Sequence, residues 1–142
     1  MNLTTLIENT TSRSDLSCEH GLSLYIETET HKILFDAGQS GAFADNAEKL
    51  GIDLSAVDLC ILSHGHYDHG GGLARFLERN TKAPIYLSCH AFGGHYNAAG
   101  KYIGLDRNLQ KNNRLIFTDG KTTIAPNITL HQIPVPPSDP AG

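Results

Sequence analysis

The sequence predicts a single α/β domain. Its 142 residues suit one domain, and 39% hydrophobic with 18% charged residues is an ordinary globular composition. Short apolar or alternating runs, typical of strands, are interleaved with segments whose apolar residues recur at helical spacing. A chain of this length can bury about two-thirds of its unfolded surface, so it needs no disulfides to fold.

The first predicted elements are two paired strands and a helix. Apolar residues alternate with polar or smaller ones over residues 22–26, which is typical of a strand with one buried face. Residues 32–36 predict a second strand, and the polar turn at residues 27–31 joins the two as a hairpin. A helix is then expected between Ser40, as its N-cap, and Gly51, which would close it.

The middle of the chain predicts strands that alternate with helices. Residues 57–62 are mostly apolar and few in number, as expected of an interior strand. The glycines at 70–72 let the backbone turn closely before a helix over residues 73–80, and residues 84–88 predict another strand. Residues 90–113 are rich in glycine, asparagine and charge, and they predict only a mixed loop or a short helix.

The last predicted elements are short strands and a tail. Residues 115–117 and 122–124 flank an Asp-Gly pair, which is a typical hairpin signal, and residues 128–133 predict a final strand. The tail at residues 134–142 contains four prolines, which cannot continue a sheet. We therefore expect one domain over residues 1–133, followed by an irregular Pro-rich tail.

The most informative stretch is residues 63–72, which places three imidazoles and a carboxylate within six residues. These are ligands that suit zinc, iron or manganese. In an extended loop, residues two apart project to the same side, so His64, His66 and Asp68 would face one space. His64 and His66 would bind one ion. Asp68 and His69 would bind a second. The alternative, a solvated His-rich loop, explains neither the intervening acid nor the three glycines that follow.

Composition and charge argue against several other functions. A net charge of −4 and a pI near 6.0 provide no basic patch for nucleic acid or an anionic membrane. No apolar stretch reaches the length of a membrane span, and the first residues lack the features of a signal peptide. The three cysteines, Cys18, Cys60 and Cys89, form no C-x-x-C pair, which favours reduced thiols. We therefore expect a cytoplasmic protein.

Three segments together resemble the metallo-β-lactamase superfamily. They are Glu-His-Gly-Leu-Ser at residues 19–23, Leu-Phe-Asp-Ala-Gly-Gln-Ser at residues 34–40, and the His-x-His-x-Asp-His motif with its flanks at residues 62–73. Within the superfamily, they are most similar to the 7,8-dihydropterin-6-methyl-4-(β-D-ribofuranosyl)aminobenzene-5′-phosphate synthase-like branch. The resemblance runs from about residue 7 to residue 133.

The resemblance implies an αββα sandwich. This sequence matches its N-terminal half, a mixed sheet with helices on one side. Complete members of the branch are longer, and their later half supplies a third histidine for the first metal, a bridging aspartate and a last histidine for the second metal. The third histidine lies in a Gly-Cys-x-His-x-Gly segment, and this sequence stops before any such segment. We expect a half-sandwich with one uncovered sheet face, which a complementing second half or a second copy would complete.

The resemblance also assigns roles residue by residue. It implies that His64 and His66 bind the first metal ion, and that Asp68 and His69 bind the second. It places Asp36 at the end of its strand, where it would steady the ligand loop from behind. The alternative for Asp36 is an ordinary acidic residue that ends a strand before a glycine turn.

Three other residues are candidate substrate contacts. His90 follows a predicted strand and would face the cleft, while Glu19 and His20 would border the metal site or form a capped turn. His131 lies where some superfamily members carry a third ligand, but its flanks match the strand before the missing segment, which favours an ordinary strand histidine. A lone histidine needs a partner before it forms a site.

The predicted function is a metal-dependent hydrolase-type domain, incomplete as a single chain. It would use a metal-activated water on a small-molecule ester, phosphoester or related substrate, with Asp68 as the catalytic group that orients the water or accepts its proton. We expect two divalent ions, zinc foremost, with iron and manganese compatible. The alternative is a catalytically silent metal-binding module, or a fragment that needs a second half. Enzymatic activity depends on completion of the site.

Overall fold

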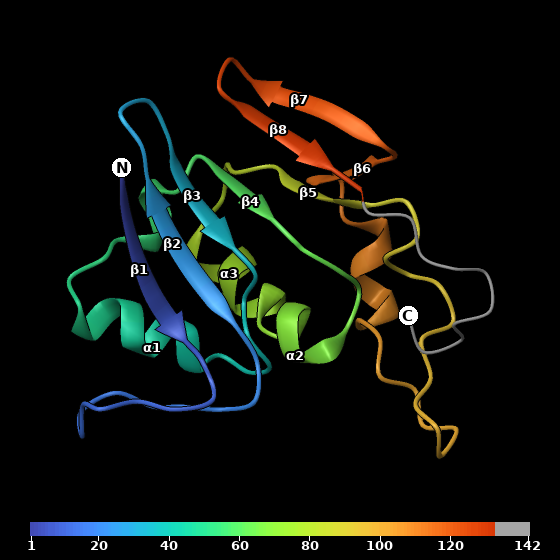
Figure 1. Cartoon of the computed structure of the whole chain (residues 1–142), viewed down its shortest axis with the longest axis horizontal. Coiled ribbons are helices and arrows are strands. Elements are labelled where there is room, and N and C mark those ends of the chain that lie inside the picture. Colours follow the sequence, from blue (N-terminus) through green and yellow to red (C-terminus); the bar gives the residue numbers. More distant parts are fainter. Residues whose placement is uncertain (133–142) are drawn as a thin grey trace.

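The computed structural model describes residues 1–132, which form two sheets and several short helices (Figure 1). The strands are β1 (Asn2–Ile7), β2 (Ser23–Glu27), β3 (Lys32–Phe35), β4 (Leu59–Ile61), β5 (Ile85–Ser88), β6 (Leu115–Thr118), β7 (Lys121–Ala125) and β8 (Ile128–His131). The helices are α1 (Ala42–Lys49), α2 (Tyr67–Gly70) and α3 (Leu73–Arg79), with 3₁₀ turns η1 (Leu54–Ala56) and η2 (Arg107–Lys111). No helix within residues 1–132 is long and apolar enough to cross a membrane.

The larger sheet has the strand order β1-β2-β3-β4-β5-β6. The pairs β1–β2 and β2–β3 are antiparallel, whereas β3–β4, β4–β5 and β5–β6 are parallel, so the predicted mixed sheet is confirmed. Because β3, β4 and β5 run in the same direction, their carboxyl ends meet at one edge of the sheet. The segments that begin at residues 36, 62 and 89 leave from this edge, which is where open α/β sheets bind ligands.

The central strands are apolar on both faces. Leu34 on β3 and Cys60 on β4 pack into the core beneath the helices. Their neighbours Ile33, Leu59 and Ile61 form a second buried cluster on the opposite face. Successive side chains of a strand point to opposite faces, so this alternation requires a layer of apolar residues on each side of the sheet.

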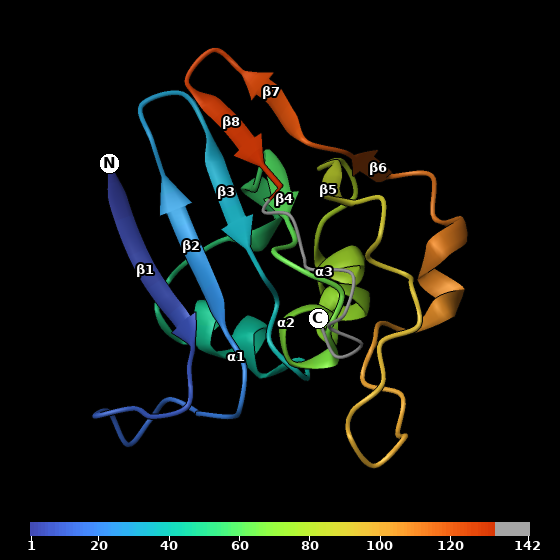
Figure 2. The same cartoon turned by 45° about the vertical axis from the view of Figure 1, so that its right-hand side comes forward.

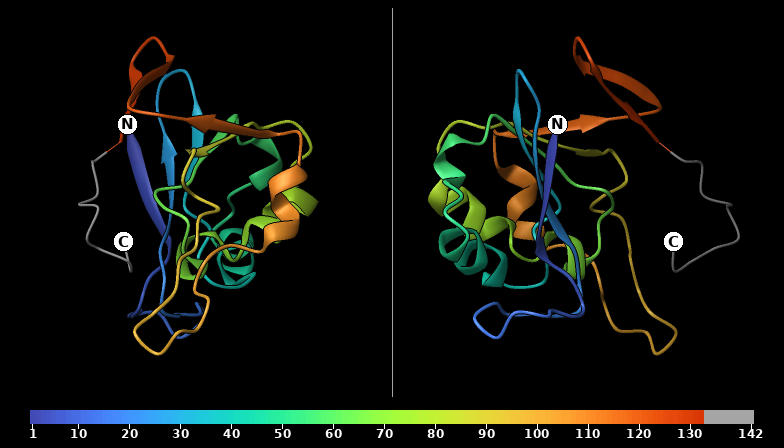
Figure 3. Two further views of the ribbon diagram at one scale, coloured as in Figure 1. Left: turned by 90° about the vertical axis from the view of Figure 1, so that its right-hand side faces the viewer. Right: turned by 60° about the vertical axis from the view of Figure 1, so that its left-hand side comes forward.

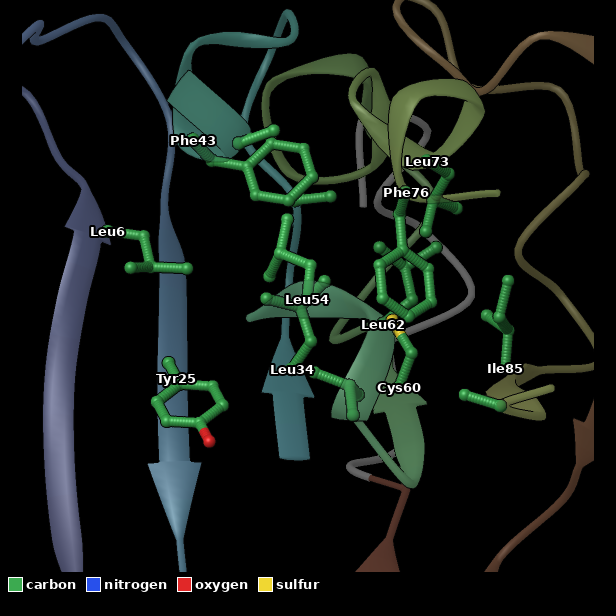
Figure 4. Close-up of a cluster of buried hydrophobic side chains, with 14 of the residues drawn as sticks. Leu6, Tyr25, Leu34, Phe43, Leu54, Cys60, Leu62, Leu73, Phe76 and Ile85 are labelled. Carbon is green, nitrogen blue, oxygen red and sulfur yellow. The ribbon is translucent and has the colours of Figure 1, made fainter. Parts of the chain in front are cut away.

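Helices α1 and α3 cover the first face. Phe43 of α1 and Phe76 of α3 are fully buried and lie over the side chains of the sheet in Figure 4. Helix α1 begins one residue later than the sequence predicts, with Gly41 as its N-cap. The hydroxyl of Ser40 accepts a hydrogen bond from the N–H of Ala42. Gly51 ends the helix with a left-handed φ of 74°, as expected.

The β7–β8 hairpin covers part of the second face. It lies opposite the helices in Figure 2 and in the right-hand view of Figure 3. Ile124, Ile128 and Leu130 of the hairpin pack against the buried cluster of Ile33, Leu59 and Ile61. The hairpin therefore covers part of a face that the sequence led us to expect to be uncovered. On the edge strand β6, Ile116 and Phe117 are 41% and 43% exposed.

Two sequence-based assignments differ from the structure. The predicted hairpin between residues 115–117 and 122–124 is wrong, because β6 joins β5 in parallel while β7 pairs with β8. The Asp-Gly turn is present, with Gly120 at a φ of 66°, but it leads from one sheet to the other. Strand β1 was not predicted at all. The predicted tail at residues 134–142 lies outside the described residues.

Candidate metal centre

The His-x-His-x-Asp-His motif changes conformation halfway along. His66 has extended backbone angles, with φ −105° and ψ 149°, and it is the N-cap of the single turn α2. The carbonyl of His66 accepts hydrogen bonds from the N–H groups of His69 and Gly70. Asp68 and His69 therefore lie on a helical turn. The sequence predicted an extended loop here, and this prediction is wrong from Tyr67 onward. The backbone hydrogen bonds to the carbonyl of His66 form a helical turn there instead.

Three side chains of the motif converge. His64, Asp68 and His69 each offer a ligand atom, and these atoms all lie within 4.8 Å of one another. The Nε2 atom of His69 is 3.5 Å from Oδ2 of Asp68, and the rings of His64 and His69 have centroids 4.2 Å apart. All three residues are partly buried. Two imidazoles and a carboxylate form a donor set that suits a divalent cation, and three protein ligands are usual at a catalytic zinc.

His66 lies beside this cluster. Its ring meets that of His64 edge-on, with centroids 4.7 Å apart, and its Nε2 atom is buried without a hydrogen-bond partner among the described residues. An unpartnered buried imidazole nitrogen is unfavourable unless an ion or another group satisfies it. The donor set and this orphaned nitrogen together fit a metal centre. The assignment of His64 with His66 to one ion, and of Asp68 with His69 to another, stays a prediction.

Burial favours the metal-binding form of two of these histidines. It lowers the pKa of His64, and the neighbouring rings of His69 and His66 lower it further. Burial also lowers the pKa of His66, with a smaller contribution from the His95 ring, whose centroid is 5.1 Å away. Neutral imidazole carries the lone pair that binds a metal, and a lowered pKa favours this neutral form in both residues.

Asp36 lies directly behind the cluster. Its side chain is fully buried, and its Oδ1 atom accepts a hydrogen bond from the N–H of Ser63 at 2.7 Å. Its Oδ2 atom accepts from the Ser63 hydroxyl at 2.6 Å and contacts Nδ1 of His69 at 2.7 Å. The hydrogen bond to Asp36 raises the pKa of His69 and turns its Nε2 atom toward Asp68.

The backbone of Asp36 is itself unusual. Its φ of 59° is the one left-handed value among the non-glycine residues that the structure describes. Such a conformation costs about 1–2 kcal/mol, although aspartate tolerates it better than most residues. Strained backbone of this kind persists where surrounding contacts fix it, and it is concentrated at functional sites.

The segment around Glu19 and His20 borders the cluster. The carboxylate of Glu19 accepts hydrogen bonds from the N–H groups of Gln39 and Ser40 and from the Ser40 hydroxyl. Glu19 therefore holds the loop after β3. His20 is largely exposed, and its Nε2 atom lies 3.1 Å from Oδ2 of Asp68. Of these two candidates, the structure brings His20 to the metal ligands.

The loop after β5 contributes a different histidine from the one singled out in the sequence. His90 is exposed, and its carbonyl contacts Nε2 of His95 at 3.1 Å. The ring of His95 reaches the motif and lies against His66. No spacing pattern in the sequence identified His95. His131 is an exposed residue of β8, opposite Lys121 in the hairpin.

The same loop closes over the motif through its backbone. The N–H of Tyr67 donates to the carbonyl of Ile103 at 2.9 Å, and His66 forms an isolated β-bridge with Gly104. A Cβ atom on Gly65 would lie 1.9 Å from the carbonyl oxygen of Ala91. Glycine at position 65 therefore allows an approach between the two loops that any side chain would prevent.

Comparisons with known proteins identify the family of this chain. The family model of the metallo-beta-lactamase superfamily matches residues 16–142. An uncharacterized protein of Methanocaldococcus jannaschii is 34% identical over 107 residues, which cover 75% of this chain and 41% of that protein. The 7,8-dihydropterin-6-methyl-4-(beta-D-ribofuranosyl)-aminobenzene-5′-phosphate synthase of the same organism is 39% identical over 80 residues, covering 52% of this chain and 27% of the synthase. The chain spans less than half the length of either relative.

Solved structures show the same fold. A metal-dependent hydrolase of the beta-lactamase superfamily superposes with a TM-score of 0.74 and 32% identity, covering 91% of this chain and 46% of that one. A quorum-quenching N-acyl homoserine lactone lactonase shares the fold with a TM-score of 0.60 at 19% identity, covering 78% of this chain and 49% of the lactonase. The predicted α/β fold and the family resemblance are confirmed. The chain belongs to the metallo-beta-lactamase superfamily.

Proposed function

We propose that this chain provides metal ligands and the general acid–base group of a metal-dependent hydrolase. The observation that carries the proposal is the convergence of His64, Asp68 and His69 within 4.8 Å. The substrate would be a small-molecule ester, phosphoester or related compound. The hydrolase named among the structural relatives supports the reaction class, and the substrate itself is part of the proposal.

The residues of the chain have distinct roles in this proposal. A divalent cation bound here would supply Lewis acidity, which lowers the pKa of water from about 15.7 toward 7. His64, His66 and His69 would bind such cations through imidazole nitrogen. Asp68 would orient the attacking water and accept its proton at Oδ2. The Nε2 atom of His20, 3.1 Å from that oxygen, would donate a hydrogen bond to the ionised carboxylate of Asp68.

The proposal includes two ions, with zinc as the leading metal. His64 and His66 would serve one, and Asp68 and His69 the other. Mixed nitrogen and oxygen donors accept iron and manganese as well. Since two ligands per ion fall short of the usual three, further ligands would come from a complementing half or a second copy of the chain. The exposed Ile116 and Phe117 on the edge strand β6 form an apolar surface that such a partner would cover.

One specific observation favours a second candidate. The ligand atoms of His64, Asp68 and His69 form the one group of three or more that converges among the described residues, so the chain by itself would hold a single ion. Without the second ion it would not turn over substrate. This would make it a catalytically silent metal-binding module. Metal stoichiometry and turnover, measured together, separate the two functions.

Replacing His66 with alanine tests the hydrolase directly. With a second copy of the chain to complete the site, the zinc-loaded protein should hydrolyse an activated phosphodiester or ester. His66→Ala should reduce this turnover by more than the roughly 10–100-fold that loss of a supporting residue costs. His31→Ala is the matched control, because His31 lies at the opposite end of β3 from Asp36. Two ions with turnover support the hydrolase. One ion without turnover supports the silent module, and failure to bind zinc contradicts both.

A further inference from the structure

Ser63 lies between the carboxylate behind the metal cluster and one of the proposed ligands. Its hydroxyl oxygen is 2.6 Å from Oδ2 of Asp36 and 2.9 Å from Nδ1 of His64. Its backbone N–H also donates to Oδ1 of Asp36 at 2.7 Å. Both oxygens of one buried carboxylate thus hold Ser63, which fixes the position of its hydroxyl beside the His64 ring.

Counting hydrogens determines the direction of these bonds. A carboxylate has only acceptors, and a serine hydroxyl has one hydrogen and two lone pairs. The hydroxyl therefore donates along the short contact to Asp36, which leaves a lone pair facing His64. Nδ1 of His64 must then carry the hydrogen in this contact. In the neutral ring, Nε2 is left with the free lone pair that a cation needs.

Asp36 contacts the Nδ1 atom of His69 directly, with no hydroxyl between them. This Nδ1 atom is 2.7 Å from Oδ2 of Asp36, the oxygen that also accepts from Ser63. We propose that Ser63 is a positioning residue whose hydroxyl relays the constraint from Asp36 to His64, so that His64 and His69 both present Nε2 to the cluster. The proposal rests on the proposed function only in that the cluster binds a cation.

A purely structural role for Ser63 makes a different prediction from the relay. The structural role requires only the backbone N–H, which every substitution except proline keeps. The relay requires the hydroxyl. Ser63→Thr retains the hydroxyl, and Ser63→Val has nearly the same shape without it. Ser63 is exposed, so the additional methyl groups have space. Ser63→Ala is a second variant without the hydroxyl, in case valine impairs folding.

The experiment measures the tautomer of His64 in the metal-free chain. Nitrogen NMR of ¹⁵N-histidine-labelled protein at neutral pH distinguishes a protonated from an unprotonated ring nitrogen. We expect Nδ1–H in the parent and in Ser63→Thr, and loss of that preference in Ser63→Val and Ser63→Ala. Zn²⁺ affinity, measured by competition with a chelator, should fall about 10–100-fold in the two variants without the hydroxyl and recover in Ser63→Thr.

The tautomer decides the proposal independently of metal binding. An unprotonated Nδ1 in the parent would overturn the relay, as would Ser63→Val retaining both the tautomer and the affinity of the parent. If the parent shows the expected tautomer but does not bind Zn²⁺, the relay stands and the proposed function fails. If the parent binds Zn²⁺ and the serine variants show no change in tautomer, the metal centre stands and the relay fails.

Discussion

Asp36→Asn should weaken Zn²⁺ binding by about 100-fold or more while leaving the backbone in place. Asparagine has nearly the same shape and tolerates the left-handed φ of 59°. Its single oxygen can accept from the N–H of Ser63, but its amide group would then face the Ser63 hydroxyl and Nδ1 of His69. His69 would lose the acceptor of its Nδ1–H, and the Ser63 hydroxyl would lose the acceptor that orients it toward His64. Loss of one supporting contact costs about 10–100-fold, and two ligands are affected here.

Asp58→Asn is the matched control for Asp36→Asn. Asp58 also accepts a backbone hydrogen bond, from the N–H of Lys32 at 2.8 Å, but it is exposed and precedes β4, at the end of the strand away from the cluster. Chelator competition measures the affinity, and urea denaturation reports any general loss of stability. Parent-like Zn²⁺ affinity in a folded Asp36→Asn variant would show that the buried carboxylate does not support the ligands.

Gly65→Ala should cost about 1–3 kcal/mol of stability, or more, and disrupt the metal centre as well. The added Cβ would lie 1.9 Å from the carbonyl oxygen of Ala91, so one of the two loops must move. Such a shift would displace His64 and His66 on either side of the glycine. The effect arises from backbone contact, and no rearrangement of side chains can relieve it.

Gly93→Ala controls for alanine substitution in this region. A Cβ on Gly93 would meet its nearest atom, the carbonyl oxygen of His90, at 3.2 Å, which requires a shift of only a few tenths of an ångström. Urea denaturation and Zn²⁺ titration of both variants make the comparison. Equal stability and equal zinc binding in Gly65→Ala and Gly93→Ala would contradict the close approach of the two loops.

The central strands were predictable because their signal is local. Residues 32–36, 57–62 and 84–88 are short apolar runs, and all three became interior strands. The pairing of β6 was not predictable in this way. The Asp-Gly turn fixes a reversal of the chain, but available edges of the sheet decide which strand each segment joins. Strand β1 was not predicted because apolar and polar residues alternate only weakly along it, with threonines at its centre.

The candidate site was predictable in its chemistry but less so in its geometry. Spacing identified His64, His66, Asp68 and His69 as a group, and the family resemblance added Asp36. The helical turn α2, which brings His64 together with Asp68 and His69, depends on backbone hydrogen bonds that the ligand spacing does not encode. The hydroxyl relay and the approach of His20 to Asp68 join residues far apart in the chain, so folding had to place them.

The central claim is that His64, Asp68 and His69 are ligands of bound divalent cations. X-ray absorption at the zinc edge of the Zn²⁺-loaded chain tests it most directly. We expect a first shell of nitrogen and oxygen at about 2.0–2.2 Å, with imidazole scattering that decreases in His64→Ala and in His69→Ala. A shell that is unchanged in both variants, or one dominated by sulfur at about 2.3 Å, would place zinc elsewhere in the protein and contradict the account.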